Sequence, residues 1–548
     1  MSKDNTMASG TMRAAPDLSR YPMLDHEQIG HLRHIHNLVS QEDNDWDGMG
    51  SAQWGQETSD SYRYQFAQMS YCLGFAHFHH LPAAPGAFRP TFEQAIRKMQ
   101  LPEVWAYWNG TSKGSRVTDP DIVELREGWR DPIVKENIMY SGRLFAMLGM
   151  HSMLFDSDRY DEPGAISLRW EPMFQGLGPE VYEYSYSSIA DNLYWQMAET
   201  GWYGVVCEPN CLFIVCNQFA ILGFRFLDLR RGTSVAEEVT RAFTDAWHKR
   251  GMLDEDGEYW RIWLVKQDRP LQLAGGAGSQ WTALNMNAWN RELVHKLYPE
   301  QIRDMIRRSA DGLVTLMPPP ATAELRRARR ENRAPLMPDG GTDYQWSSPS
   351  FGYTAACMAE LGDTENLRGM LAHADRYMTP TWRDGGLYYP RNDTSYDADG
   401  NLVYMDRLTG NAMLGYARLN VTDGLWKMYN EPWGPEHFRQ PNLARLDGRA
   451  DVARAWYDPT ESLLALTLRP VQQDSAAIQM EIANVRSGRN WTLFLDGSPV
   501  VTSDGRDTLD VLDTSKVGAH YVGNALVLNC TLRAATDLAL SLHGTAIY

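Results

Sequence analysis

The stretch Cys207-Glu208-Pro209-Asn210-Cys211-Leu212-Phe213-Ile214-Val215-Cys216-Asn217 holds three of the chain's 6 cysteines, beside a carboxylate and two side-chain amides. Pro209 fixes its own φ and lacks a donor N–H, so it predicts a break or a helix start. The apolar run after it predicts a buried helix on which Phe213 and Cys216 share one face. Cys207 precedes the proline, and a loop there would turn it to face Cys216 across a cavity.

Four interpretations of this cysteine cluster stay open. A structural zinc site needs paired Cys-x-x-Cys motifs or histidines, and the spacings here, C-x3-C and C-x4-C, have no partner pair. A disulfide belongs to an oxidising compartment, which a chain without a secretory signal does not indicate. A catalytic thiol pair would use one thiol as acid or base while a neighbour tunes its pKa. Cysteine is also a small buried hydrophobe, and spacing alone favours that plainer interpretation.

The composition limits the classes of function. The chain has 548 residues, enough for one large domain and a smaller one, with 43% hydrophobic and 22% charged residues. A formal net charge of -17 and the lack of a long Lys/Arg run argue against nucleic acid and anionic membranes as partners. The polar start and the lack of a long apolar run predict a cytoplasmic protein without membrane insertion.

The pattern along the chain predicts three parts. Residues 1–20 are expected to form a disordered tail, and residues 21–434 to form helices that come in pairs separated by Gly- and Pro-rich loops. Paired helices predict a toroid of helical hairpins, an (α/α)-barrel, whose inner ring surrounds a cavity. Helices are expected over residues 26–38, 62–78, 137–154, 186–199, 212–227, 234–250, 299–316, 350–361, 366–377 and 409–420.

Residues 435–548 have a different character. Short β-branched or Leu-rich runs alternate with Gly, Asp and Ser, which predicts an antiparallel β-sandwich. This part has no cluster of His, Cys and carboxylate residues, so we expect it to be structural. The expected strands cover residues 463–468, 477–483, 491–495, 500–501, 525–532 and 538–542.

Several motifs resemble the linalool dehydratase-isomerase family. Cys207 and Cys216 have the spacing of that family's two active-site cysteines, with a phenylalanine where Phe213 stands, and Tyr64 falls on a family active-site tyrosine. The resemblance implies a cofactor-free (α/α)6-barrel that dehydrates and isomerises a tertiary allylic terpenoid alcohol, with the C-terminal β domain as an addition. The other matching segments are Arg63-Tyr64, Val104-Trp105-Ala106-Tyr107-Trp108 and Asn137-Ile138-Met139-Tyr140-Ser141-Gly142.

The sequence also departs from that family. The resemblance places Val39 at the family's catalytic aspartate, Asp45 at a family tyrosine, and Arg143 at the histidine after the Asn-Ile-Met-x-Ser-Gly motif. The cavity is therefore expected to be kept while the proton-transfer groups are partly exchanged. Arg143 falls on an apolar helical stripe, and a guanidinium is costly to bury unpaired. We expect it to pair with Asp45 or Glu208, to bind a substrate oxygen, or to do both in turn.

Together these features predict a cofactor-independent lyase or isomerase. It would act by proton transfer on a small apolar substrate, isoprenoid- or polyketide-like, that carries an oxygen function, and no metal is implied. Cys207 and Cys216 would be the acid–base pair, and Asp45 would supply or orient the proton that Val39 cannot. Tyr64 would bind the substrate oxygen and Arg143 its carbonyl or carboxylate. The substrate-binding residues would be Phe213, Met139, Glu208 and Val39.

Three alternatives stay open from the sequence. A cyclase could promote ring closure, possibly pericyclic, in the same cavity, because the acids of the family are changed. A helical toroid followed by a sandwich is also the plan of polysaccharide lyases and glycoside hydrolases, which need paired carboxylates or a Tyr/His/Arg set. A binding or scaffold protein that has lost catalysis is the third alternative. The resemblance leaves open a homo-oligomer.

Overall fold

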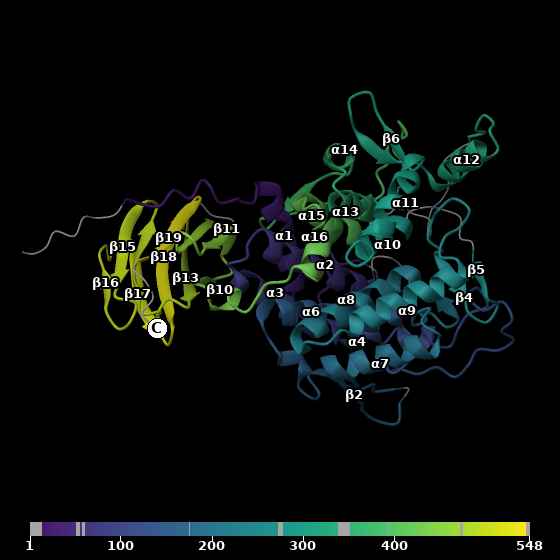
Figure 1. Cartoon of the computed structure of the whole chain (residues 1–548), viewed down its shortest axis with the longest axis horizontal. Helices are drawn as coiled ribbons and strands as arrows, with labels where there is room; N and C mark the ends of the chain where they lie inside the picture. The colour runs from purple at the N-terminus through teal and green to yellow at the C-terminus, as the bar shows by residue number, and fades with distance from the viewer. Residues whose placement is uncertain are drawn as a thin grey trace, which may run out of the picture. The chain divides into compact units, whose positions relative to one another are not determined.

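The computed structural model describes residues 14–50, 55–56, 61–174, 176–271, 278–337, 351–392, 394–471 and 475–543 (Figure 1). Its contacts divide the chain into two compact units. The helical unit comprises Asp25–His79 and Phe88–Phe438, and the β unit comprises His80–Ala87, Arg439–Tyr548 and the N-terminal residues up to Leu24. The sequence predicts a helical domain at residues 21–434 and a β domain at residues 435–548, and this division stays a prediction.

Six helices of the helical unit form its interior, and we call them the inner helices. Every residue of α6 is buried, and α2 is buried as far as His77. Helices that are buried all round belong in a core. Each inner helix contacts the next one in the order α2, α6, α8, α10, α13 and α15, and α15 contacts α2 in turn. The inner helices are α2 (Tyr62–His79), α6 (Ile138–Phe155), α8 (Ile214–Arg231), α10 (Gly278–Met286), α13 (Phe351–Leu361) and α15 (Leu414–Leu419), which follows the π-helical turn η2 (Thr409–Met413).

Amphipathic helices cover the inner ones. In α9 the buried residues include Val239, Phe243 and Trp247, which recur at helical spacing and leave the opposite face polar. Helix α7 packs on α6, α9 on α8, α11 on α10 and α14 on α13. The remaining helices are α1 (His26–Val39), α3 (Pro85–Met99), α4 (Pro102–Trp105), α5 (Trp108–Thr111), α7 (Tyr186–Glu199), α9 (Val235–Arg250), α11 (Arg291–Arg303), α12 (Pro319–Arg330), α14 (Thr364–Tyr377) and α16 (Gly424–Asn430).

Short strands connect the helices of this unit. The helix predicted over residues 299–316 is wrong, because α11 ends at Arg303 and a hairpin follows. That hairpin turns near Gly312, whose φ of +84° suits glycine. The strands of the helical unit are β1 (Ile166–Trp170), β2 (Glu180–Tyr184), β3 (Cys211–Leu212), β4 (Ile262–Leu264), β5 (Arg269–Leu271), β6 (Ile306–Arg308), β7 (Val314–Leu316), β8 (Thr381–Arg383) and β9 (Gly386–Tyr388).

The β unit contains two antiparallel sheets, with strand orders β10-β13-β18-β17 and β11-β12-β19-β14-β15-β16. In β13, Ile478, Met480 and Ile482 are buried at every second position, as expected for a strand with one covered face. The predicted antiparallel strands are thus confirmed, and their packing as a sandwich stays a prediction. The strands are β10 (Asn442–Leu446), β11 (Ala450–Asp458), β12 (Leu463–Pro470), β13 (Ser475–Ala483), β14 (Asn490–Leu495), β15 (Ser498–Ser503), β16 (Leu509–Val511), β17 (Val517–Val522), β18 (Ala525–Arg533) and β19 (Thr536–His543).

The N-terminal segment requires a correction. Residues 1–13 of the predicted tail lie outside the described residues, but Leu18 is buried against Leu463, Ala465 and Phe494 of the β unit. Its apolar side chain therefore belongs to a core rather than to a disordered tail. Within the described part of the chain, no helix has the length and apolar character that crossing a bilayer requires.

Candidate active site

The candidate site is built at the N-terminal ends of inner helices. Tyr64 lies in the first turn of α2, Cys216 in the first turn of α8, Trp281 in the first turn of α10 and Tyr353 in the first turn of α13. The contacts described below join residues from four of these helix ends. Helix N-termini carry partial positive charge, so their convergence favours electron-rich groups in the space between them.

Pro209 interrupts the chain before α8, as predicted. The Cys207 N–H donates to the Cys211 carbonyl (2.8 Å) and the Cys211 N–H donates to the Glu208 carbonyl (2.9 Å), which closes a tight turn. Asn217 of α8 ties the preceding loop to the helix: its side chain accepts from the Val205 N–H (2.8 Å) and donates to the Val205 carbonyl (3.2 Å). The loop that carries Cys207 is therefore held on the helix that carries Cys216.

The Cys207 thiol has two polar neighbours. Its sulfur lies 3.7 Å from Asn137 Oδ1 and 4.0 Å from Glu208 Oε1, and Tyr107 donates to the same Asn137 oxygen (2.8 Å). Asn137 precedes α6 with a φ of +55°, a conformation that asparagine tolerates better than most residues. Burial, Glu208 and Cys216 together raise the pKa of Cys207 well above its usual value. Cys207 is thus a neutral thiol at neutral pH.

Cys216 is also protonated at neutral pH. Burial raises its pKa to about 12, although the Arg143 charge opposes this shift. The charge of Glu208 acts on both thiols and raises the pKa of each. All six cysteines are free and buried. Among the described residues, no group of three or more His, Cys, Asp or Glu side chains is arranged to hold a metal ion.

Arg63 and Tyr64 form a second polar pair. The Arg63 guanidinium donates to the Gln56 carbonyl (2.7 Å) and to the Tyr64 hydroxyl (3.1 Å), and its carbon lies 4.0 Å from the centre of the Tyr107 ring. The Tyr64 hydroxyl points to the sulfur of Met139. Burial raises the pKa of Tyr64, so this hydroxyl remains a neutral donor.

Arg143 lies in the second turn of α6 and is 0% exposed. Its guanidinium carbon lies 4.6 Å from the Tyr64 ring centre, 4.2 Å from that of Phe219 and 5.1 Å from that of Trp281. Among the described residues, none of its three guanidinium nitrogens has a hydrogen-bond partner. The ion pair predicted with Asp45 or Glu208 is therefore wrong, because aromatic faces surround the charge instead of a carboxylate.

The other predicted residues lie elsewhere. Asp45 is exposed in the loop after α1, where its carboxylate accepts from the Asp47 N–H (3.1 Å), so its expected place in the cavity is corrected. Val39 is fully buried as the last residue of α1. Phe213 is half-buried and packs on the apolar cluster of Cys211, Ile262 and Leu264. The structure thus brings together Cys207, Glu208, Cys216, Tyr64, Met139 and Arg143.

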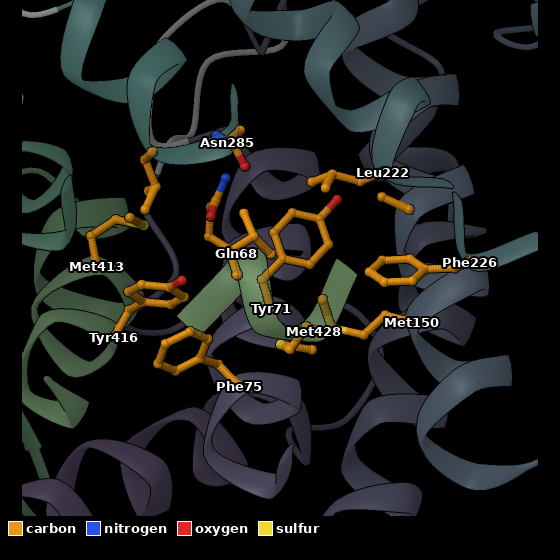
Figure 2. Close-up of a pocket in the computed structure, with 13 residues that line it drawn as sticks. Gln68, Tyr71, Phe75, Met150, Leu222, Phe226, Asn285, Met413, Tyr416 and Met428 are labelled. Atoms are coloured by element: carbon orange, nitrogen blue, oxygen red, sulfur yellow. The ribbon is translucent and has the colours of Figure 1, made fainter. Parts of the chain in front are cut away.

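A small cavity of about 20 Å³ lies between the same inner helices. Tyr71 connects it to the candidate site: its hydroxyl donates to the Arg143 carbonyl (3.0 Å) and its ring stacks on Phe219 at 5.6 Å. Figure 2 shows Tyr71 in the middle of the lining, with Phe75 and Tyr416 on one side and Phe226 on the other. The lining is Gln68, Tyr71, Phe75, Ala146, Met150, Leu222, Phe226, Leu284, Asn285, Met413, Tyr416, Leu425 and Met428.

Four further residues belong to the site that were not predicted from the sequence: Tyr107, Phe219, Trp281 and Tyr353. Tyr107 lies in a segment that matched the family, and Phe219 follows Cys216 by three residues on one helical face, so both had a signal. Trp281 and Tyr353, whose rings stack at 4.1 Å, had none. Their contact joins α10 to α13, which lie far apart in the sequence.

Comparison with known proteins decides the family. A family model described as linalool dehydratase/isomerase matches residues 63–395, more than half of the 548 residues. The chain belongs to this family. The matched range contains the residues of the candidate site from Arg63 to Tyr353. Membership of the linalool dehydratase/isomerase family supports an enzyme of the lyase or isomerase type.

Solved structures give a weaker likeness. An alpha-amylase from Clostridium perfringens is 12% identical with a TM-score of 0.33, and the match covers 64% of this chain and 86% of that one. The endoglucanase CelQ from Clostridium thermocellum, complexed with cellobiose and cellotriose, is 10% identical with a TM-score of 0.35, covering 96% of this chain and 94% of that one. Likenesses of this size carry no argument about this chain.

Proposed function

We propose that the protein is a lyase or isomerase that transfers protons on an isoprenoid- or polyketide-like substrate with an oxygen function. The observation that carries the proposal is the neutral Cys207 thiol in contact with both Glu208 and Asn137, beside the second thiol of Cys216. The cyclic order of contacts among the inner helices supports an (α/α)6-barrel as the scaffold.

Cys207 and Glu208 would share the proton transfer. In a dehydration, the substrate hydroxyl leaves as water with the proton of Cys207, and the electron pair of a neighbouring C–H bond forms the double bond. The proton of that C–H bond goes to Glu208, which then returns one proton to Cys207, so the enzyme ends as it began. Cys216 would hold or exchange the same proton, because its thiol is also neutral.

The proton-supplying role predicted for Asp45 passes to Cys207, and Glu208 is the carboxylate that returns a proton to this thiol. The Asp45 carboxylate is exposed and engaged with a neighbouring backbone N–H, whereas Glu208 Oε1 contacts the Cys207 thiol. Tyr64 would donate to the substrate oxygen, with Arg63 fixing the hydroxyl. Met139 would be part of the wall, because its sulfur lies against Tyr64.

Turnover of a small panel tests this proposal. Linalool and other isoprenoid alcohols and ketones are incubated with the wild type, Cys207→Ala, Glu208→Gln and the control Cys211→Ala, and products are followed by gas chromatography and mass spectrometry. General acid–base catalysis contributes about 10²- to 10⁴-fold, so the first two variants should lose about that much rate. Cys211 packs on the separate Ile262–Leu264 cluster, so its variant should keep its rate.

Two outcomes contradict the proposal. If Cys207→Ala and Glu208→Gln keep turnover within about fivefold of the wild type, proton transfer through this pair is the wrong mechanism. The cavity would then act by shaping its substrate, as the cyclase alternative requires. If cellotriose is hydrolysed while every isoprenoid is left unchanged, the glycoside hydrolase alternative takes its place.

A further inference from the structure

Arg143 is a buried cation whose guanidinium faces contact aromatic rings, whereas its N–H edge has no hydrogen-bond partner among the described residues. The rings of Tyr64, Phe219 and Trp281 lie 4.2–5.1 Å from its guanidinium carbon. A guanidinium also carries five N–H donors in its plane, and it cannot lose its charge in a protein. Among the described residues no acceptor meets these donors. The fold thus covers the cation with π faces and leaves its hydrogen-bonding edge unused.

The charges around Arg143 do not balance it. Glu208 is the carboxylate that acts electrostatically on both thiols, and it acts on Arg63 as well. Arg63 already donates to Gln56 and Tyr64. Both thiols are neutral, and the converging helix ends add positive potential. Among these described groups, two guanidinium groups, Arg63 and Arg143, thus face one carboxylate, Glu208, and a ligand with one negative charge would complete the balance.

The aromatic faces are also occupied by this cation. Ring faces around an empty cavity would stabilise a carbocation. Here they already hold the guanidinium, and a second positive charge beside it would be repelled. A path that builds negative charge on oxygen is favoured instead, because buried donors that are in place before the reaction stabilise such charge strongly.

We propose, resting on the function above, that the substrate carries an anionic oxygen function, a carboxylate or a carbonyl that becomes an enolate, and that this oxygen binds the Arg143 edge. Glu208 removes a proton from the carbon next to the carbonyl, and the electron pair moves onto the oxygen held by Arg143. Cys207 donates its proton to the leaving hydroxyl or to the distal carbon of the enolate, and the proton on Glu208 returns to Cys207. This assigns Arg143 as the residue that selects acids and enolisable carbonyls over plain alcohols.

Binding measured by calorimetry at pH 7.5 tests the assignment. The probes are geranic acid for the carboxylate, 2-acetyl-1,3-cyclohexanedione, which is an enolate at this pH, and geraniol as the neutral control. Hydrogen bonds to charged groups contribute about 1.5–3 kcal/mol, so at least one anionic probe should bind the wild type about 10- to 100-fold more tightly than geraniol. Which of the two anionic probes binds distinguishes a carboxylate from an enolate.

Arg143→Met is the decisive variant, with Arg225→Met as a matched control on α8. The methionine keeps an unbranched apolar stem among the rings, and replacing an unpaired buried charge should leave the melting temperature equal or higher. The preference for the anionic probe should vanish in Arg143→Met, with geraniol affinity unchanged, and should persist in Arg225→Met, whose arginine binds the Tyr429 carbonyl (2.8 Å).

Three results overturn the assignment: no anionic preference in the wild type, an unchanged preference in Arg143→Met, or a lower melting temperature in Arg143→Met with both probe classes weakened equally. Arg143→His keeps a donor at this position, and it should retain part of the preference. Cys207→Ala should bind the anionic probe as the wild type does. A loss of turnover without a loss of this preference therefore separates the mechanism of proton transfer from the role of Arg143.

Discussion

Glu360 is a buried carboxyl group at the C-terminal part of α13, away from the candidate site. It accepts from the N–H groups of Leu425 (2.9 Å) and Trp426 (3.2 Å) at the start of α16, and from Asn287 Nδ2 (2.7 Å). These bonds anchor α16, which contributes Leu425 and Met428 to the cavity lining. Burial raises the pKa of Glu360 to about 7, with Asp423 adding to the shift and the hydrogen bonds opposing it.

The raised pKa predicts how stability depends on pH. An unfolded glutamate titrates near 4.5, so between that pH and about 7 the folded state binds more protons than the unfolded state. Stability from this group is therefore complete below pH 4.5 and is lost as the pH rises through 7. The difference between the two pKa values corresponds to about 3 kcal/mol of unfolding free energy.

Urea unfolding of the wild type and Glu360→Gln at pH 5, 6, 7 and 8 measures this effect. The variant has a constant offset, because its amide meets backbone donors, but the free-energy difference should shift in its favour by about 2–3 kcal/mol from pH 5 to pH 8. Glu324→Gln is the control, since hydrogen bonds to Arg333 and Leu336 lower the pKa of Glu324 to about 2 and it stays ionised throughout. A wild-type-to-variant difference that changes by less than about 1 kcal/mol would refute the reasoning.

Three further predictions concern the candidate site. Asn217→Ala should lower the unfolding free energy by about 1–3 kcal/mol and slow turnover, because the Val205 backbone groups lose their partner. Calorimetry measures the first effect and turnover rates the second, and an unchanged rate would show that the loop does not position Cys207. Asp45→Asn should keep turnover within about fivefold, and a loss of about 100-fold or more would return the acid role to Asp45. Iodoacetamide should label Cys207 and Cys216 slowly at pH 7.5 and rapidly in urea, by mass spectrometry, because both are buried neutral thiols; fast native labelling would contradict this.

Local patterns predicted the parts of the fold that depend on nearby residues. Helix α7 covers the predicted residues 186–199 because Ser185 and Ser188 form a capping box before a periodic apolar run. The turn at Cys207 follows from Pro209. By contrast, residues 306–316 form a hairpin because Gly312 reverses the chain between short strands, and the apolar pattern alone resembled a helix.

The site was less predictable because its contacts join distant segments. The sequence showed that Arg143 lies on an apolar stripe, but Trp281 and Phe219 approach it from two other helices. Spacing could not show that aromatic faces, rather than a carboxylate, meet the charge. Asp45 lies in a loop, where alignment to a family position does not fix the direction of the side chain. Glu208 was included as a binding residue, and only the structure shows its contact with Cys207.

The central claim is that Cys207 and Glu208 carry the transferred proton. A single turnover in deuterated water measures this directly, with enzyme that is equilibrated in that solvent and in excess over the substrate, and with the product's isotope content read by mass spectrometry for the wild type, Cys211→Ala and Cys207→Ala. The account predicts solvent deuterium in the isomerised product of the wild type and of Cys211→Ala, and a loss of about 10²- to 10⁴-fold in the rate of Cys207→Ala. A product free of deuterium, formed by Cys207→Ala as fast as by the wild type, would contradict it.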